Sequence, residues 1–143
     1  MGLKGAILAG MAMDVGSARY RTFDELLLYC YRVAGTVGLM MTYVMGVREG
    51  AALRRAADLG IAMQLTNICR DVAEDEGRDR VYLPRDLLEV AANSSTRDAA
   101  VRAAVAELLR RADAFYRSAD AGLSALPARC AVAIRAARLI YAE

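Results

Sequence analysis

The sequence predicts an all-α protein, and two features of its 143 residues favour this fold class. Hydrophobic residues make up 57% of the chain, and the abundant Ala, Leu, Arg and Met are strong helix formers. Proline, which interrupts helices, occurs only at Pro84 and Pro127. A chain of this length forms one domain or part of one, and it is long enough to bury a hydrophobic core.

Caps and helix-breaking residues divide the apolar periodicity into separate helices. We expect helices over residues 3–15, 22–45, 51–74, 84–91 and 97–121, and a last helix after a break at 122–127. Thr22 and Glu25 form the Thr-x-x-Glu pattern of a capping box at the start of the second helix. We interpret residues 74–84 as a charged loop, and residues 93–96 (Asn-Ser-Ser-Thr) as a turn that caps the next helix.

Both ends of the sequence lack the signals that cap a helix. Leu3 lies inside an apolar helical pattern with no capping residue before it. The pattern that runs through Tyr141 contains no glycine or proline to stop it. We therefore expect residues 1–143 to form part of a larger helical domain.

The charge and the residue content exclude several classes of function. The 19 basic and 17 acidic residues are interleaved, whereas a nucleic-acid surface needs a basic stripe. Histidine is absent, which excludes Ser-His-Asp and Cys-His catalysis and histidine-based zinc sites. Cys30, Cys69 and Cys130 are scattered, as is typical of reduced cysteines in a cytosolic protein. Any metal site in this chain must therefore use oxygen ligands.

The apolar segments are too short to predict a membrane span. The longest, over residues 37–47, includes Thr42 and falls well below the length that crosses a bilayer. The start of the chain has a lysine before a short apolar stretch, but Asp14 and Arg19 follow without a clean cleavage pattern. We expect a cytoplasmic protein, either free or resting on a membrane surface.

Polar side chains gather on one face of the third predicted helix. At about 100° per residue, Gln64, Asn67, Asp71 and Asp75 share a narrow arc, and the two aspartates are one turn apart. Like charges at this spacing repel each other, so a cation between them would stabilise the helix. Two carboxylates and an amide suit Mg²⁺, and Arg70 on the flank could bind a phosphate. From these residues alone, a solvated helix face and a magnesium–diphosphate site both remain open.

Four stretches of this sequence resemble a known family. Residues 59–84, "LGIAMQLTNICRDVAEDEGRDRVYLP", resemble the second aspartate-rich signature of the squalene and phytoene synthase family. Residues 29–44, "YCYRVAGTVGLMMTYV", resemble the family's other signature. Residues 12–26 and 118–141 are similar to bacterial members, so the resemblance covers essentially the whole chain.

The resemblance implies a fold and a reaction. The implied fold is an isoprenoid-synthase helical bundle, here a partial one without its N-terminal and C-terminal helices. The implied reaction is a head-to-head prenyl transfer that condenses two geranylgeranyl diphosphates to phytoene through prephytoene diphosphate, in carotenoid biosynthesis. One alternative is a squalene or dehydrosqualene synthase that uses farnesyl diphosphate. Another is a non-catalytic relative that acts as a scaffold or assembly factor.

The family's motifs also imply roles for individual residues. The implied ligands of Mg²⁺, with Mn²⁺ as the alternative ion, are Asn67, Asp71 and Asp75. The implied substrate contacts are Gln64 and Arg70 at the diphosphate, Arg80 and Tyr82 at the mouth, Tyr29 and Tyr141 in the reaction chamber, and Val33 and Val37 beside the prenyl chain. The residues expected to carry the chemistry are Tyr29, Arg70, Asp71 and Asp75.

Small residues inside the second helix have two compatible interpretations. Glycine within a helix costs about 1 kcal/mol relative to alanine, so Gly35 and Gly38 need a reason. They allow close contact with another helix, or they leave room for a prenyl chain, as the resemblance suggests. Met40, Met41 and Met45 on the same helix are expected to be core residues.

The resemblance also shows what this sequence lacks. The family uses two acidic motifs that face each other across the cavity, and the first would lie upstream of Ala12, where this chain has none. One motif cannot hold the full set of metal ions, so we expect residues 1–143 alone to be inactive or nearly so. Apolar faces left exposed would promote self-association.

Overall fold

The computed structural model describes residues 2–15, 17–92 and 96–142 and confirms the all-α prediction. Its elements are α1 (Leu3–Met13), α2 (Phe23–Cys30), η1 (Tyr31–Gly35), α3 (Thr36–Val44), α4 (Gly50–Arg70), α5 (Val72–Gly77), α6 (Arg85–Ala92), α7 (Arg97–Asp120), η2 (Leu123–Ala125) and α8 (Ala128–Ala142). Of the turn predicted at 93–96, residues 93–95 lie outside the described residues. Thr96 caps α7, because its hydroxyl accepts a hydrogen bond from the Ala99 N–H at 3.4 Å.

The helix predicted over residues 22–45 forms as α2, η1 and α3 in direct succession, with η1 a π-helical turn. Thr22 caps it by accepting a hydrogen bond from the Glu25 N–H at 3.3 Å. The reciprocal half of the capping box is absent: the Glu25 carboxylate accepts from the Arg21 N–H at 2.8 Å instead. The Arg21 guanidinium also donates to this carboxylate, at 2.7 Å. This charge-assisted contact favours Arg21 over the Thr22 N–H as the partner of Glu25.

The prediction of one continuous helix over residues 51–74 is wrong at one residue. α4 ends at Arg70 and α5 begins at Val72, because the backbone of Asp71 leaves the helical region with φ −101° and ψ 14°. The hydrogen bond from the Asp75 N–H to the Asp71 carbonyl oxygen is nevertheless kept at 2.9 Å. The one-turn spacing of the two aspartates therefore survives the interruption of the helix.

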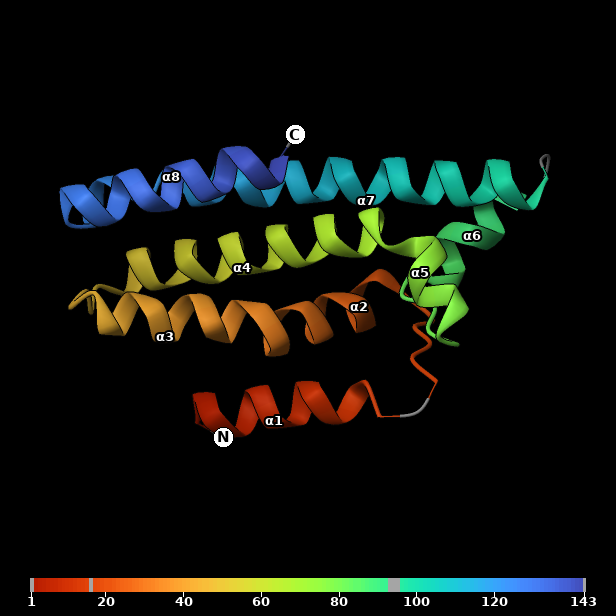
Figure 1. Ribbon diagram of the computed structural model, residues 1–143, viewed down its shortest axis with the longest axis horizontal. Coiled ribbons are helices and arrows are strands. Elements are labelled where there is room, and N and C mark those ends of the chain that lie inside the picture. Colours follow the sequence, from red (N-terminus) through yellow and green to blue (C-terminus); the bar gives the residue numbers. More distant parts are fainter. Residues whose placement is uncertain (1, 16, 93–95, 143) are drawn as a thin grey trace.

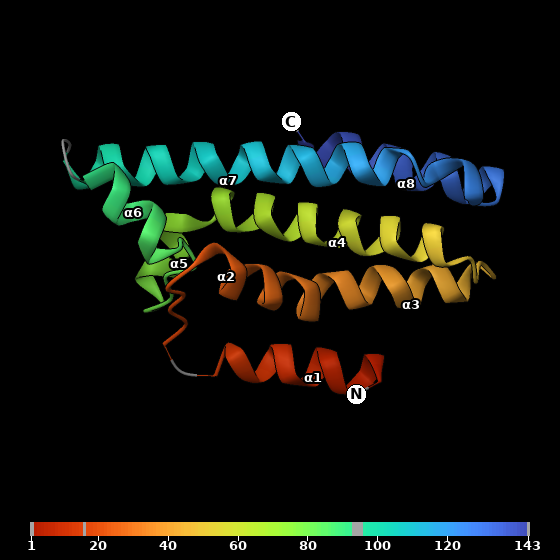
Figure 2. The same ribbon diagram turned by 180° about the vertical axis from the view of Figure 1, so that it is seen from behind.

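The helices lie in tiers, with α4 near the middle (Figure 1). α7 packs on one side of α4, and η1 and α3 pack on the other. α1 lies outside η1, and α8 runs back alongside α7 (Figure 2). α5 and α6 lie at one end of the bundle, near the start of α7 (Figure 1). α4 contacts α2, η1, α3, α7 and α8, so it is the central helix of this arrangement.

The hydrophobic core lies between α2, α4 and α7. Leu26, Leu65 and Leu108, one from each of these helices, are 0% exposed. Burying a leucine side chain contributes about 1.5–3 kcal/mol, so contacts of this kind hold the tiers together. Within the described ranges, none of the helices combines the length and the apolar character that crossing a bilayer requires.

Candidate functional site

An apolar groove runs along α4. It has a volume of about 330 Å³, and its lining residues on α4 extend from Ala52 to Asn67. This span is about 22 Å at about 1.5 Å of rise per residue. The other walls come from η1 and α3 and from the chain between Ala119 and Tyr141. The groove brings together five of the residues singled out from the sequence: Val33, Val37, Gln64, Asn67 and Tyr141.

Two methionines that were expected in the core line this groove instead. Met41 and Met45 are lining residues, and Met41 is 51% exposed. They continue the stripe of Val33 and Val37, because residues four apart share a helix face. That spacing was the signal in the sequence that could have placed them. The groove wall formed by η1 and α3 therefore combines this apolar stripe with the small residues Ala34 and Gly38 and with Thr42.

The groove ends at two amide side chains. Gln64 and Asn67, one turn apart on α4, both line it. The Oδ1 atom of Asn67 is buried and has no hydrogen-bond partner. A buried polar atom without a partner is costly, so this oxygen is suited to a ligand that supplies the missing contact.

Asp71 lies one turn beyond Asn67, and its N–H donates to the Asn67 carbonyl oxygen at 2.9 Å. Arg70 holds its carboxylate in a fork, with Nε donating to Oδ1 at 2.6 Å and Nη2 donating to Oδ2 at 2.7 Å. These hydrogen bonds hold the pKa of Asp71 below its usual value. The Arg70 side chain is 63% exposed, so it lies at the surface beside the carboxylate that it neutralises.

The surroundings of Asp75 shift its pKa in the opposite direction from that of Asp71. Its pKa is raised, first by burial and then by the charge of Asp71. It borders a small pocket together with Arg80 and Tyr82, and its carbonyl oxygen accepts a hydrogen bond from the Arg80 N–H at 2.9 Å. The positive charges of Arg78 and then Arg80 partly offset the rise of this pKa. Asp75 is thus a half-buried carboxylate whose ionised form would be stabilised by a further cation.

Tyr29 and Tyr82 lie in a buried cluster and are not among the residues that line the groove. Their ring centroids are 5.3 Å apart, and Tyr20 packs against both. Both hydroxyls donate to the carboxylate of Asp14, the C-cap of α1, at 2.8 Å from Tyr29 and 2.7 Å from Tyr82. Burial and the neighbouring Tyr82 and Asp14 groups raise the pKa of Tyr29. Tyr29 is therefore a neutral hydrogen-bond donor, and sequence reasoning did not identify Asp14 as its partner.

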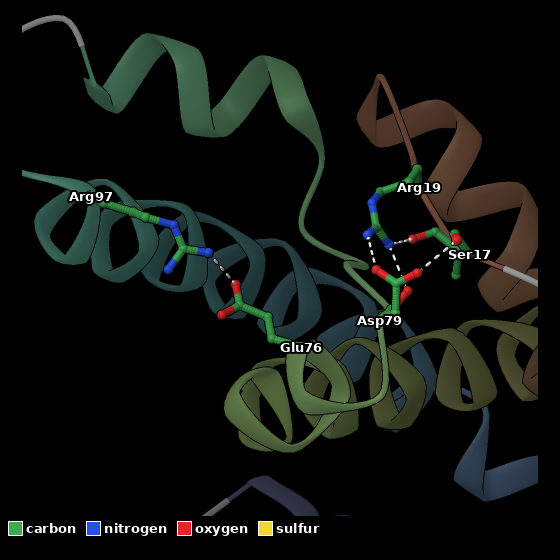
Figure 3. Close-up of polar contacts among 6 residues, drawn as sticks. Ser17, Arg19, Glu76, Asp79 and Arg97 are labelled. Atoms are coloured by element: carbon green, nitrogen blue, oxygen red, sulfur yellow. Dashed lines mark hydrogen bonds and ion pairs between the residues drawn. The ribbon is translucent and has the colours of Figure 1, made fainter.

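Polar contacts hold the end of α5 and the turn that follows it from two sides (Figure 3). On one side, Arg19 contacts the Asp79 carboxylate at 2.6 Å, and the Ser17 hydroxyl donates to it at 2.8 Å. On the other, Arg97 at the start of α7 donates to Glu76 at 2.8 Å. Asp79 has a positive φ of 58°, so this turn is held in a conformation that few side chains adopt.

The donor set fits an oxygen-coordinated divalent cation. Across the described residues, no three His, Cys, Asp or Glu side chains gather into a ready metal centre. The candidate ligands are instead one amide and two carboxylates, from Asn67, Asp71 and Asp75, on successive turns. The unpartnered Asn67 Oδ1 and the raised pKa of Asp75 are both what a site for a cation would show. A ligand that brings its own oxygens would complete the coordination, as Mg²⁺ sites commonly do.

The class defined by this fold and site is an all-α protein with an apolar groove that ends at acidic and amide side chains. The model of the squalene/phytoene synthase family matches residues 4–143. The chain therefore belongs to the squalene/phytoene synthase family.

Curated relatives agree with this assignment. The chain is 51% identical over 142 residues to a phytoene synthase of Pseudescherichia vulneris, covering 95% of this chain and 46% of that protein. It is 51% identical over 140 residues to a 15-cis-phytoene synthase of Enterobacter agglomerans, covering 94% and 48%. The chain thus spans about half the length of the curated relatives it matches.

Solved structures share the fold. A squalene synthase of Alicyclobacillus acidocaldarius superposes with a TM-score of 0.90 at 24% identity, over 98% of this chain and 56% of that one. A dehydrosqualene synthase in complex with a ligand superposes with a TM-score of 0.85 at 29% identity, over 99% and 52%. The helical arrangement described above is therefore that of about half of a squalene-synthase-type chain.

Proposed function

We propose that the chain binds a prenyl diphosphate and takes part in the head-to-head condensation of two such molecules. The observation that carries the proposal is the apolar groove along α4 that ends at the unpartnered oxygen of Asn67. Asp71 and Asp75 follow on the next two turns. A prenyl diphosphate has the matching form, a long apolar chain with a charged group at one end.

The polar end of the groove supplies the contacts for the charged group. Asn67, Asp71 and Asp75 would hold Mg²⁺, with Mn²⁺ as the alternative. When bound, the ion neutralises the charge of the departing diphosphate. The Nε and Nη2 atoms of Arg70 hold Asp71, so the remaining N–H groups of its exposed guanidinium would donate to diphosphate oxygens. Gln64 would donate its amide N–H to the same group.

The apolar walls have their own task in this reaction. Val33, Val37 and Met41 would cover the prenyl chain and exclude water, which would otherwise capture a carbocation. Tyr141 lies at the groove and also borders the surface hollow that contains Arg70. Its position supports a contact near the junction of the prenyl chain and the diphosphate.

The relatives favour one substrate. The two at 51% identity are both named phytoene synthases, so we propose geranylgeranyl diphosphate as substrate, phytoene as product and carotenoid biosynthesis as the pathway. The solved neighbours are squalene and dehydrosqualene synthases, which favours farnesyl diphosphate as the second candidate. The calculated span of about 22 Å along α4 gives room for a long chain.

Titration calorimetry with unreactive thiolo analogues of geranylgeranyl and farnesyl diphosphate tests the proposal. We expect binding only with Mg²⁺ present, and tighter binding of the geranylgeranyl analogue. Asp71→Asn and Asp75→Asn should each weaken this binding by at least about tenfold, which corresponds to about 1.4 kcal/mol. The matched control is Glu89→Gln, since Glu89 also pairs with an arginine, Arg85, but lies on the exposed face of α6 and borders neither the groove nor the hollow that contains Arg70.

The outcomes separate the candidates. Tighter binding of the farnesyl analogue would replace geranylgeranyl with farnesyl diphosphate as the substrate. Equal binding by Asp75→Asn and the unmodified chain would remove the proposed metal site. A diphosphate-release assay with the natural substrates measures turnover, and it also tests the expectation that residues 1–143 alone are nearly inactive.

Exposed apolar side chains support the expected contact of a cytoplasmic protein with a membrane surface or with a second copy. Leu8 and Met11 on α1 are 65% and 59% exposed, and Val15 just beyond it is 85% exposed. Flotation with phosphatidylcholine and phosphatidylglycerol vesicles measures the first contact. Light scattering measures the second. That residues 1–143 form part of one squalene/phytoene synthase domain likewise stays a prediction.

A further inference from the structure

The carboxylate of Asp14 is shared between two buried tyrosines. Its Oδ2 accepts a hydrogen bond from the Tyr29 hydroxyl at 2.8 Å, and its Oδ1 accepts one from the Tyr82 hydroxyl at 2.7 Å. Tyr29 is 3% exposed and Tyr82 is 7% exposed. Hydrogen bonds to an ionised acceptor are stronger than those between neutral groups, and each oxygen here serves one hydroxyl.

This single carboxylate joins three segments that are distant in the sequence. Asp14 ends α1, Tyr29 lies in α2, and Tyr82 lies between α5 and α6. The backbone continues the connection, because the Val81 N–H donates to the Ala18 carbonyl oxygen at 3.0 Å. The residues that follow α1 are therefore attached to the residues that follow α5, both at the surface and in the interior.

The attached segment carries part of the proposed diphosphate site. Arg80 lies two residues before Tyr82, and its N–H donates to the Asp75 carbonyl oxygen at 2.9 Å. Asp75, Arg80 and Tyr82 border the same small pocket. A shift of the Tyr82 ring would therefore move the chain that supports Asp75 and presents Arg80.

A purely surface attachment would not hold this segment firmly. The contact between Arg19 and Asp79 has side chains that are 50% and 74% exposed, and exposed ion pairs contribute little. The hydroxyl contacts of Asp14 are part-buried, so water weakens them less than it weakens the exposed ion pair. Asp14 is not among the residues that line the groove, which places it behind the site rather than in it.

We propose that Asp14 is a positioning residue whose carboxylate holds the Tyr29 and Tyr82 hydroxyls and so keeps residues 78–84 in the place where Asp75 and Arg80 receive a diphosphate. This inference rests on the proposed function. Asp14 does not bind the substrate, and it acts through Tyr82.

The test compares Asp14→Ala, Asp14→Asn and Tyr82→Phe with Thr36→Val in the full chain. Thr36→Val is the control, because it also removes a buried hydroxyl, one that donates to the Arg32 carbonyl oxygen at 2.7 Å, in a residue that lines neither the groove nor the hollow that contains Arg70. Each variant is measured at a temperature at which circular dichroism shows it folded. The readouts are Mg²⁺-dependent binding of the thiolo analogue of geranylgeranyl diphosphate and deuterium exchange of peptides that cover residues 78–84.

We expect Asp14→Ala to bind the analogue at least about tenfold more weakly and to exchange faster at residues 78–84. Asp14→Asn should recover part of both effects, because the amide keeps one acceptor oxygen. Tyr82→Phe should resemble Asp14→Ala, and Thr36→Val should change neither readout. Asp14→Asn and Tyr82→Phe carry the test if Asp14→Ala does not fold.

Two results overturn the inference, and they have different consequences for the proposed function. If the Asp14 variants are folded and bind like the unmodified chain, the inference fails and the proposed function stands. If the unmodified chain binds no analogue with Mg²⁺, the proposed function fails and the inference fails with it.

Discussion

A Cβ atom added to Gly38 on α3 would lie 2.2 Å from the carbonyl oxygen of Ala56 on α4. Gly60 on α4 has the same relation to Ala34, whose carbonyl oxygen would lie 2.3 Å from an added Cβ. The two helical segments therefore cross at points where only a hydrogen atom fits. Ala34, Gly38 and Gly60 also line the groove, and the second interpretation, room for a prenyl chain, stays a prediction.

Gly38→Ala should destabilise the chain. An overpacked contact with rigid backbone costs about 1–3 kcal/mol, and the better helix propensity of alanine returns about 1 kcal/mol at most. We expect a net loss of free energy of unfolding, measured by urea denaturation. Gly50→Ala is the control, since a Cβ there meets only the Arg54 side chain at 4.0 Å, and it should be neutral or slightly stabilising. Equal stability of the two variants would contradict the close contact.

Asp75→Asn should raise the thermal midpoint of the metal-free chain at neutral pH and abolish its response to Mg²⁺. Burial and the Asp71 charge raise the pKa of Asp75, so its ionised form opposes folding. This penalty is present at neutral pH and is relieved as the pH falls through the raised pKa. The unmodified chain should gain stability with Mg²⁺ because a bound ion favours the folded state. Calorimetry with and without Mg²⁺ checks both halves, and a lower metal-free midpoint for Asp75→Asn would refute the first.

The turn at Asp79 predicts an unusual order of variant stabilities. Asp79 has φ 58°, a conformation that glycine adopts freely and alanine does not. Asp79→Gly and Asp79→Ala both lose the contacts to Ser17 and Arg19. We therefore expect Asp79→Ala to have the lower thermal midpoint of the two. The opposite order would mean that the positive φ does not persist in solution.

Glu107 should contribute to stability in a defined pH range. Hydrogen bonds from Arg110 and Arg111 lower the pKa of its carboxyl from 4.5 to about 2. A lowered pKa stabilises the fold above the unfolded value, and this contribution is lost as the pH falls from 4.5 towards about 2. Glu107→Gln should therefore be less stable than the unmodified chain at neutral pH. The difference should vanish in acid, as followed by circular dichroism.

Helical order was predictable because it depends on local chemistry. The cap at Thr22 is a contact over three residues, and it formed at the predicted position. The spacing of Asn67, Asp71 and Asp75 follows from helix geometry alone, and the hydrogen bonds along it are intact. The stripe from Val33 to Met45 obeys the same rule, although its methionines were assigned to the core.

The interruption at Asp71 was not predictable in the same way. The residues on both sides of it have helical periodicity, and the periodicity contains no signal for the break. Arg70 donates a hydrogen bond to the Asp71 side chain at the residue where the backbone leaves the helical conformation. The sequence on either side of a break can thus favour one long helix while the structure has two.

The sequence by itself determined most of the helices and the one-turn spacing of Asn67, Asp71 and Asp75, because these depend on residues within a few turns of one another. Only the tertiary structure decided that Asp14 would accept the hydroxyls of Tyr29 and Tyr82, which lie 15 and 68 residues away. Such a contact depends on how the ends of α1 and α5 meet α2. The packing of whole helices decides how these ends are placed, and the periodicity of the sequence does not predict it.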